Sequence, residues 1–319
     1  MPKGEQQLIQ RIRSMAGRNA SVITGIGDDA AVLRVPPKHD LLVTTDFSIE
    51  GVHFRREWHS AAIVGHRCLT RGLSDIAAMG GEPRAAFLSL ALAEDVPRKW
   101  IDQFVKGLLG LAREFRVSLA GGDTAQAAQG IQADIVVVGS VPKGTAVLRS
   151  GAKAGEQIYV TGSLGGSAAA LERLRKSLPL GVERSPHFHP VPRIEVGRWL
   201  RRHKIASAMI DVSDGLSTDL AHICKESDVG AEIEVDAIPR AACGNGKQQV
   251  ELAFALNGGD DYELLFTASK PAPKQIAGVP VTRIGRITAA KGMWLIGPKQ
   301  RRQKLVAQGW EHFTHRVNG

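Results

Sequence analysis

The sequence predicts a mixed fold of the α+β or mixed α/β class, organised as two domains. Apolar stretches of strand length and stretches with helical spacing occur in both halves without strict alternation. A chain of 319 residues has the length of about two domains. Its composition, 43% hydrophobic and 23% charged, is that of a soluble globular protein. A stretch rich in Gly and Lys at 143–155 places the boundary near residue 150, so the predicted domains are 1–148 and 149–319.

The N-terminal half combines acidic strand-like segments with amphipathic helices. The stretch 25–54 contains two short apolar segments with acidic residues beside them. Pro97 opens a helix on which Trp100, Phe104 and Leu108 recur at helical spacing. Helices are therefore predicted over 4–16, 60–79 and 97–115, and strands over 84–93, 117–120 and 131–141.

The C-terminal half contains the same kinds of element. Three prolines and two histidines in 180–192 predict a loop. The apolar runs around 284–287 and 293–296 predict a pair of strands. Strands are also predicted over 157–160 and 208–210, and helices over 168–178 and 218–226.

Charge and cysteine content narrow the class of protein. The formal net charge of +9 suits nucleic acid, anionic lipid or a phosphorylated small ligand, or it reflects a solvated basic surface. The basic residues are scattered and only 5% of residues are aromatic, so single-stranded nucleic acid is not the expected ligand. No apolar run reaches the length of a membrane span, and residues 1–13 have no signal-peptide core. Three widely spaced cysteines form no metal or redox motif, which favours a cytoplasmic protein with reduced thiols.

Acidic residues recur where predicted strands and helices end. Strands are predicted to end at Asp46, Asp123 and Asp211, and Asp75 lies near the end of a predicted helix. One such aspartate is usually a turn former or a cap, but repetition beside Gly, Ser and Thr favours a shared cation. Oxygen ligands without sulfur suit Mg²⁺, which commonly shares phosphate oxygens of a nucleotide.

The phosphate-binding candidates are individually weak. The chain contains no Gly-x-x-x-x-Gly-Lys-[Ser/Thr] loop. The Gly-rich turn 162–166 fits either a phosphate cradle at a helix N-terminus or an ordinary strand-to-helix turn. Gly122 beside Asp123 permits close approach of a phosphate, and Arg149 is either a phosphate clamp or surface charge. His53 and Trp310 suit either packing or ligand contact. No Ser–His–Asp or Cys–His pattern is evident, so no covalent nucleophile is predicted, which agrees with direct phosphoryl transfer.

Taken together, these motifs resemble the thiamine-monophosphate kinase family. That family belongs to the superfamily of aminoimidazole-ribonucleotide synthetase, selenophosphate synthetase and a hydrogenase-maturation protein. The most specific matches are Asp-Val-Ser-Asp-Gly-Leu at 211–216 and the acidic Gly-Gly stretch leading into Tyr262-Glu263-Leu264. The Val-His-Phe at 52–54 and the terminal Trp-Glu-His-Phe at 310–313 favour this member of the superfamily.

The resemblance implies a fold, a reaction and a set of site residues. It implies the two-domain aminoimidazole-ribonucleotide-synthetase-like fold, with an N-terminal domain that pairs across a homodimer and a C-terminal α/β domain. The implied reaction is ATP-dependent phosphorylation of thiamine monophosphate, with several Mg²⁺ ions and ATP as co-substrate. No nucleic acid or membrane partner is expected. By resemblance, the magnesium ligands would be Asp29, Thr44, Thr45, Asp46, Asp75, Asp123, Asp211 and Asp214; the ATP contacts Gly122, Asp123, Arg149 and Ser213; and the substrate contacts His53, Asp260 and Trp310.

The chain departs from the family pattern at three places, and two other functions compete. Asp260 replaces the more usual Glu, Arg71-Gly72 replace an apolar residue and Asn, and Ala125-Gln126 replace Thr-Arg. One competing function is a superfamily member that uses ATP to activate an amide or formyl oxygen. The other is a basic phosphate- or nucleic-acid-binding protein with a decayed ATP site, which the intact acidic clusters oppose because carboxylates repel a polyanion.

Overall fold

The computed structural model describes residues 5–27 and 29–311, and the chain forms two compact units. Unit 1 comprises residues 1–76 and 81–146, and unit 2 comprises residues 77–80 and 147–319. Helices and strands are mixed in both, which confirms the predicted fold class. In the described part of the chain, no helix has the length and apolar character needed to cross a bilayer.

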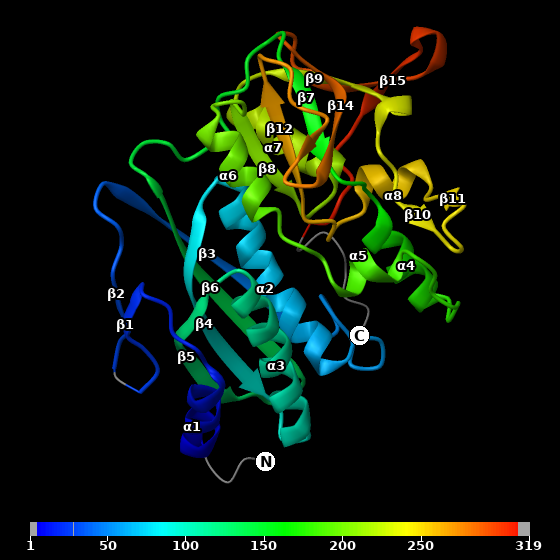
Figure 1. The fold of residues 1–319 in the computed structure, drawn as a ribbon. Coiled ribbons are helices and arrows are strands. Elements are labelled where there is room, and N and C mark those ends of the chain that lie inside the picture. The colour runs from blue at the N-terminus through cyan, green and yellow to red at the C-terminus, as the bar shows by residue number, and fades with distance from the viewer. Residues whose placement is uncertain (1–4, 28, 312–319) are drawn as a thin grey trace. The chain divides into compact units, whose positions relative to one another are not determined.

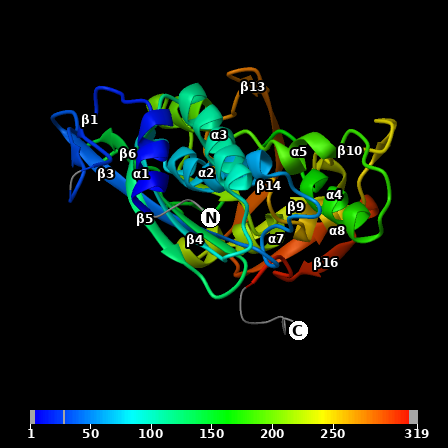
Figure 2. The same cartoon turned by 90° about the horizontal axis from the view of Figure 1, so that it is seen from below.

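Unit 1 is built on a four-stranded sheet with the order β3-β6-β4-β5 (Figure 1). The β3–β6 and β6–β4 pairs are antiparallel, whereas β4 and β5 are parallel. Parallel neighbours need a long crossover, which helix α3 supplies. Helices α2 and α3 cover one face of this sheet (Figure 2). The elements of unit 1 are α1 (Glu5–Met15), β1 (Val22–Thr24), β2 (Val32–Leu33), β3 (His39–Ile49), α2 (Ala61–Ala78), β4 (Glu82–Leu92), α3 (Arg98–Glu114), β5 (Ser118–Gln126) and β6 (Ile131–Pro142).

Two glycines allow helices α2 and α3 to cross at very short range. A Cβ atom at Gly65 would lie 2.0 Å from the carbonyl oxygen of Phe104, and one at Gly107 would lie 1.9 Å from that of Ala62. Any side chain larger than hydrogen at either position would collide with the backbone of the other helix. The helix pair therefore depends on glycine at both positions, and it carries Asp75 against the sheet.

Unit 2 is built on a larger sheet with the order β16-β15-β9-β14-β7-β12-β8 (Figure 1). Neighbouring strands are antiparallel except for the parallel pair β9–β15, and β13 pairs with β14 at one side. Its strands are β7 (Gln157–Thr161), β8 (Ala208–Val212), β9 (Gly230–Glu234), β10 (Ala242–Cys243), β11 (Gln248–Gln249), β12 (Glu263–Ala268), β13 (Gln275–Ile276), β14 (Val279–Thr288), β15 (Gly292–Ile296) and β16 (Arg302–Leu305). Its helices are α4 (Gly166–Arg175), α5 (Arg184–Phe188), α6 (Ile194–Arg202), α7 (Leu216–Glu226) and α8 (Leu252–Asn257), with short 3-10 turns η1 (Val235–Ala237) and η2 (Pro298–Gln300).

The core of unit 2 forms between this sheet and helix α7. Leu216, Leu220 and Ile223 recur at helical spacing on α7 and are fully buried. They join the same cluster as strand residues such as Ile210 and Leu265. Burial of these side chains holds the beginning of α7 against the end of β8, where Asp211 and Asp214 lie.

Several sequence-based element predictions were wrong in detail. The segment 180–192 is not entirely loop, because it contains α5, and helix α6 was not predicted. The strands β14 and β15 do not pair with each other, because β9 lies between them. Strand β3 continues to Ile49 and β5 to Gln126, so Asp46 and Asp123 lie inside strands and not at their ends.

Candidate functional site

A pair of carboxylates forms the centre of the candidate site in unit 1. Along β3, side chains alternate between the two faces of the sheet, and Thr44 and Asp46 lie on the face covered by α2. The hydroxyl of Thr44 donates a hydrogen bond to the carboxylate of Asp75 on α2. Asp46 lies close enough to Asp75 for the two carboxyl groups to interact. Three predicted magnesium ligands, two on β3 and one on α2, therefore meet on one face of the sheet, and Thr44 and Asp75 are 31 residues apart in sequence.

The electrostatics of this pair favour a bound cation. Burial, followed by the negative charge of Asp75, raises the pKa of Asp46 from 3.8 to about 7, while Arg71 opposes the shift. Without a cation the pair therefore holds a proton near neutral pH. Two carboxylates and one hydroxyl form an oxygen-only donor set that fits Mg²⁺. Bound Mg²⁺ would replace the shared proton and relieve the repulsion between the two carboxylates.

Without a divalent cation, Asp46 is expected to lower the stability of the protein as pH rises from about 4 to 7. Its raised pKa means that the folded protein binds more protons than the unfolded chain in this window, so the free energy of unfolding falls with increasing pH. The loss is a few kcal/mol at most. Chemical denaturation of the wild type and of Asp46→Asn in a chelator measures it as the difference between their pH profiles. Mg²⁺ should remove that difference, and identical profiles in the chelator would contradict the assignment.

The strand register places two other predicted magnesium ligands on the opposite face. Thr45 points away from α2 and donates to Asp134 of β6, at 2.6 Å. Asp134 pairs with Ser89 of β4, which in turn pairs with Asp123 of β5, so these three side chains share that opposite face. The side chains of Thr45 and Asp123 therefore do not point toward the Asp46–Asp75 pair.

Two further predicted positions in unit 1 have specific local surroundings. Gly122 has a φ of +147°, and a Cβ there would lie 1.8 Å from the carbonyl oxygen of Leu88. The close packing of β5 against β4 is therefore a sufficient reason for glycine at this position, whether or not a phosphate binds there. Asp29 is exposed in the segment between β1 and β2, and Asp28 lies outside the described residues.

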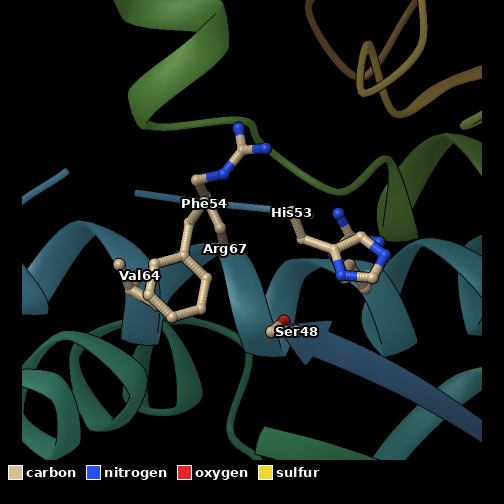
Figure 3. A pocket seen from close by; sticks show the side chains of 6 residues that line it. Ser48, His53, Phe54, Val64 and Arg67 are labelled. Atoms are coloured by element: carbon tan, nitrogen blue, oxygen red, sulfur yellow. The ribbon is translucent and has the colours of Figure 1, made fainter. Parts of the chain in front are cut away.

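His53 lies in a small pocket at the end of β3 (Figure 3). A tight turn returns the chain here, because the N–H of His53 donates to the carbonyl oxygen of Ile49 at 2.9 Å and Gly51 has a φ of +84°. The N–H of Ile49 donates to Nδ1 of His53 at 3.0 Å. An Nδ1 that accepts a hydrogen bond leaves the proton of a neutral imidazole on Nε2. The pocket is lined by Ser48, His53, Phe54, Val64, Arg67 and Arg71.

A second acidic group lies in unit 2, where β8 leads into α7. Asp211 is buried on β8, and Asp214 follows in the turn. Asp219 of α7 accepts from the N–H groups of Asp214 and Gly215, at 3.2 and 3.0 Å. Burial, then the charges of Asp211 and Asp214, raise the pKa of Asp219 well above its usual value. Together with His222, the carboxylates of Asp214 and Asp219 could hold a metal ion.

The turn after β8 also collects residues that are distant in sequence. The N–H of Asp260 donates to the carbonyl oxygen of Ser213 at 2.8 Å, and the N–H of Trp310 donates to that of Asp214 at 2.9 Å. Ser213, Asp214, Asp260 and Trp310, which the resemblance assigns to ATP, magnesium and substrate, therefore lie around one turn. His312 and Phe313 lie outside the described residues.

The segment that carries Asp260 is held in an unusual backbone conformation. Asp260 and Tyr262 have φ values of +64° and +52°, which are rare for residues other than glycine. The buried hydroxyl of Tyr262 donates to the carboxylate of Asp260 at 2.6 Å. Glu263 accepts from Arg193 at 2.7 Å and from Thr161 at 2.6 Å. The Tyr262 contact orients the Asp260 carboxylate, and the contacts of Glu263 hold the start of β12 that follows it.

The Gly-rich turn 162–166 is explained by packing. The carboxylate of the buried Asp261 accepts from the N–H of Gly165 at 2.7 Å and of Ser167 at 3.5 Å, so it occupies the start of α4. Of the two interpretations of this turn, the structural one is favoured. Arg149 is exposed, and its carbonyl oxygen accepts from the hydroxyl of Ser227 at 3.1 Å.

Comparison with known proteins decides the family. The family described as "AIR synthase related protein, N-terminal domain" matches residues 27–141, and the corresponding C-terminal domain matches residues 153–296. The chain is 40% identical to the thiamine-monophosphate kinase of Salmonella typhimurium over 305 residues, which is 91% of this chain and 92% of the relative. The chain belongs to the thiamine-monophosphate kinase family.

Solved structures of the family have the same fold. The thiamine-monophosphate kinase of Stenotrophomonas maltophilia superimposes with a TM-score of 0.79 at 35% identity, covering 90% of this chain and 95% of that one. AaThiL in complex with AMPPCP and TMP superimposes with a TM-score of 0.77 at 30% identity, covering 97% of both chains. These matches confirm the resemblance and the two-domain fold predicted from the sequence.

Sequence reasoning missed several residues of the candidate site. Asp134 is an acidic residue inside an apolar strand, and that pattern could have identified it as a candidate site residue. Asp219 lies in the first turn of α7, where an acidic residue usually indicates only a favourable helix start. Arg67 lines the His53 pocket, which depends on a turn that could not be placed from sequence.

Proposed function

We propose that this protein transfers the γ-phosphoryl group of ATP to thiamine monophosphate, producing thiamine diphosphate and ADP. The observation that carries the proposal is the 40% identity, over nearly the full length of both chains, to a thiamine-monophosphate kinase. A related solved structure binds AMPPCP and TMP. The paired carboxylates Asp46 and Asp75 supply the cation-binding chemistry that such a reaction needs.

The transfer requires no covalent intermediate on the protein. An oxygen of the acceptor phosphate attacks the γ-phosphorus, the bond from that phosphorus to the β,γ-bridging oxygen breaks, and ADP leaves with its electron pair. A phosphate monoester carries roughly 1.5–2 negative charges at pH 7, so no side chain has to remove a proton from the attacking oxygen. The task of the protein is to hold two polyanions in line and to balance their charge.

The proposed roles follow the sequence resemblance. Mg²⁺ ions would neutralise the phosphates and orient the γ-phosphoryl group. Asp29, Thr44, Thr45, Asp46, Asp75, Asp123, Asp211 and Asp214 would hold them. ATP would contact Gly122, Asp123, Arg149 and Ser213, and thiamine monophosphate would contact His53, Asp260 and Trp310. The N-terminal domain, 1–148, would bind ATP and magnesium and dimerise, and the C-terminal α/β domain would be 149–319. Buried free thiols at Cys68 and Cys224 support a cytoplasmic location.

The direct test measures ADP release from ATP and Mg²⁺ with thiamine monophosphate present or omitted. Mass detection of thiamine diphosphate runs in parallel. ADP and thiamine diphosphate should appear in equal amounts and only when both substrates are present. ADP release without thiamine diphosphate, or equal release with the acceptor omitted, would contradict the proposal.

We also propose that two copies pair through the outer face of the sheet in unit 1. Leu41, Val43 and Phe47 alternate along β3 on the face away from α2, and their side chains are 54%, 66% and 57% exposed. Large apolar side chains on both sides of the polar Thr45–Asp134 contact on one sheet face are typical of a surface that is covered in the assembly. Because the resembled family forms homodimers, we propose that a second copy of this chain covers this face.

Replacing Val43 with glutamate is expected to shift the protein from dimer to monomer. A buried unpaired carboxylate at the centre of an apolar interface is costly to desolvate, so the association constant should fall by at least tenfold. Analytical ultracentrifugation over a concentration series measures the change. The control is Val306→Glu, the same substitution at a 52% exposed valine of unit 2, which should leave association unchanged. A wild type that sediments as a monomer at all concentrations would rule out the interface.

A further inference from the structure

The His53 pocket concentrates positive charge beside the carboxylate pair. Its lining includes the basic residues Arg67, Arg71 and His53, together with Ser48. Figure 3 shows the imidazole above Ser48 at the end of β3, with Phe54 beside Val64 at the other side. The space inside is about that of one water molecule, so the pocket could admit a single oxygen of a phosphate group to the N–H donors of the basic residues.

The periodicity of α2 explains how the arginines reach this pocket. Val64, Arg67 and Arg71 line it, and their spacing of three and four residues puts them on one face of the helix. Asp75, one turn after Arg71, lies on the same face and pairs with Asp46. One helix face therefore presents, in order, an apolar residue, two cations and a proposed metal ligand.

Arg71 lies between the His53 pocket and the Asp46–Asp75 carboxylate pair. It lines the pocket, and its charge also acts on Asp46, where it opposes the rise of the pKa of that carboxyl. Arg67 is only 3% exposed and contributes its charge from the preceding helical turn. A guanidinium group has five N–H donors in a planar fork, so Arg71 can serve a carboxylate and a phosphate oxygen together.

We propose that Arg71, with Arg67 and His53, binds the phosphate group of the acceptor and places it beside the Asp46–Asp75 pair. This inference rests on the proposed function. Because Nδ1 of His53 accepts from the N–H of Ile49, the donor that the imidazole would offer a phosphate oxygen is Nε2–H, in addition to the contacts that His53 already makes. Arg71 discriminates a phosphorylated acceptor from an unphosphorylated one, and it is assigned here as a substrate-binding residue.

The test compares the wild type with Arg71→Met and Arg71→Lys. Methionine preserves an extended apolar stem without charge, and lysine keeps the charge without the fork. The Michaelis constant for thiamine monophosphate should rise about 10- to 100-fold in the methionine variant, the loss expected for a charge-assisted hydrogen bond. The lysine variant should recover part of this loss, while the Michaelis constant for ATP changes less than twofold. Thermal denaturation confirms that each variant folds.

The alternative is that Arg71 only offsets the negative charge of Asp46 and Asp75 and does not contact the acceptor. If Arg71→Met changes the Mg²⁺ concentration needed for half-maximal rate but leaves the Michaelis constant for thiamine monophosphate unaltered, the proposal is wrong. Binding of thiamine monophosphate and of thiamine, measured by calorimetry with no ATP present, separates this from failure of the proposed function. A wild type that prefers thiamine monophosphate and loses the preference in Arg71→Met supports the pocket even without turnover. A wild type that binds both equally overturns it.

Discussion

Asp46→Asn is expected to reduce turnover by a factor on the order of 100 or more while the protein still folds. Asparagine has nearly the same shape but lacks the charge that would hold a divalent cation between β3 and α2. It also removes the charge whose burial, together with repulsion from Asp75, raises the pKa of Asp46 in the metal-free protein. The variant should therefore be at least as stable as the wild type in a chelator, and it should gain less stability from Mg²⁺.

Steady-state rates of thiamine diphosphate formation over a wide Mg²⁺ range measure the effect. The matched control is Asp40→Asn, which makes the same change on the same strand, at a carboxylate that accepts a hydrogen bond from the N–H of Gly144 at 2.7 Å. Asp40→Asn should keep turnover within twofold. Near-normal turnover of Asp46→Asn at ordinary Mg²⁺ concentrations would remove Asp46 from the metal site.

Gly107→Ala is expected to be the most destabilising single-methyl substitution in the α2–α3 pair, lowering the free energy of unfolding by about 3 kcal/mol. The new Cβ would lie 1.9 Å from the carbonyl oxygen of Ala62, so the two helices must separate. Neither atom is the end of a flexible side chain. The loss exceeds the gain of about 1 kcal/mol that alanine normally brings to a helix.

Gly110→Ala, on the same helix, is the control. A Cβ at Gly110 would meet no atom within 4 Å, so this variant should gain about 0.5–1 kcal/mol. Urea denaturation of both variants, followed by circular dichroism, gives the comparison. Equal stabilities of the two variants would show that the close approach of the helices is not required.

Elements with strong periodicity were predictable from sequence, and their exact ends were not. Most of the apolar residues that predicted α3 are buried, whereas Trp100 is half-buried and Phe115 lies just beyond the helix at its C-terminal cap. Helix α6 was missed because the basic residues Arg198, Arg201 and Arg202 mask a narrow apolar face of Ile194, Val196 and Leu200. The ends of β3 and β5 were placed too early because glycines and acids inside a strand resemble a turn.

The residue types of the candidate site were predictable, but their grouping depends on strand register. Because side chains alternate along β3, Thr44 and Asp46 lie on one face of the sheet and Thr45 lies on the other. The consecutive motif Thr-Thr-Asp does not by itself indicate that its members lie on different faces. The meeting of Asp260 and Trp310 with the turn after β8 depends on backbone hydrogen bonds across 47 and 96 residues, as 260 − 213 and 310 − 214 give. Tertiary contacts of this kind have no local sequence signal.

The pairing of β3 with β6 has a consequence for synthesis of the chain. His39 pairs with Pro142 and Ile49 with Gln132, so the two strands are separated by 142 − 39 = 103 to 132 − 49 = 83 residues. At roughly 5–20 residues per second, β3 leaves the ribosome on the order of 5–20 s before its partner. During that interval Leu41, Val43 and Phe47 are exposed without a neighbouring strand. The nascent chain therefore exposes the apolar strand β3 early, and chaperones are expected to bind first at this strand.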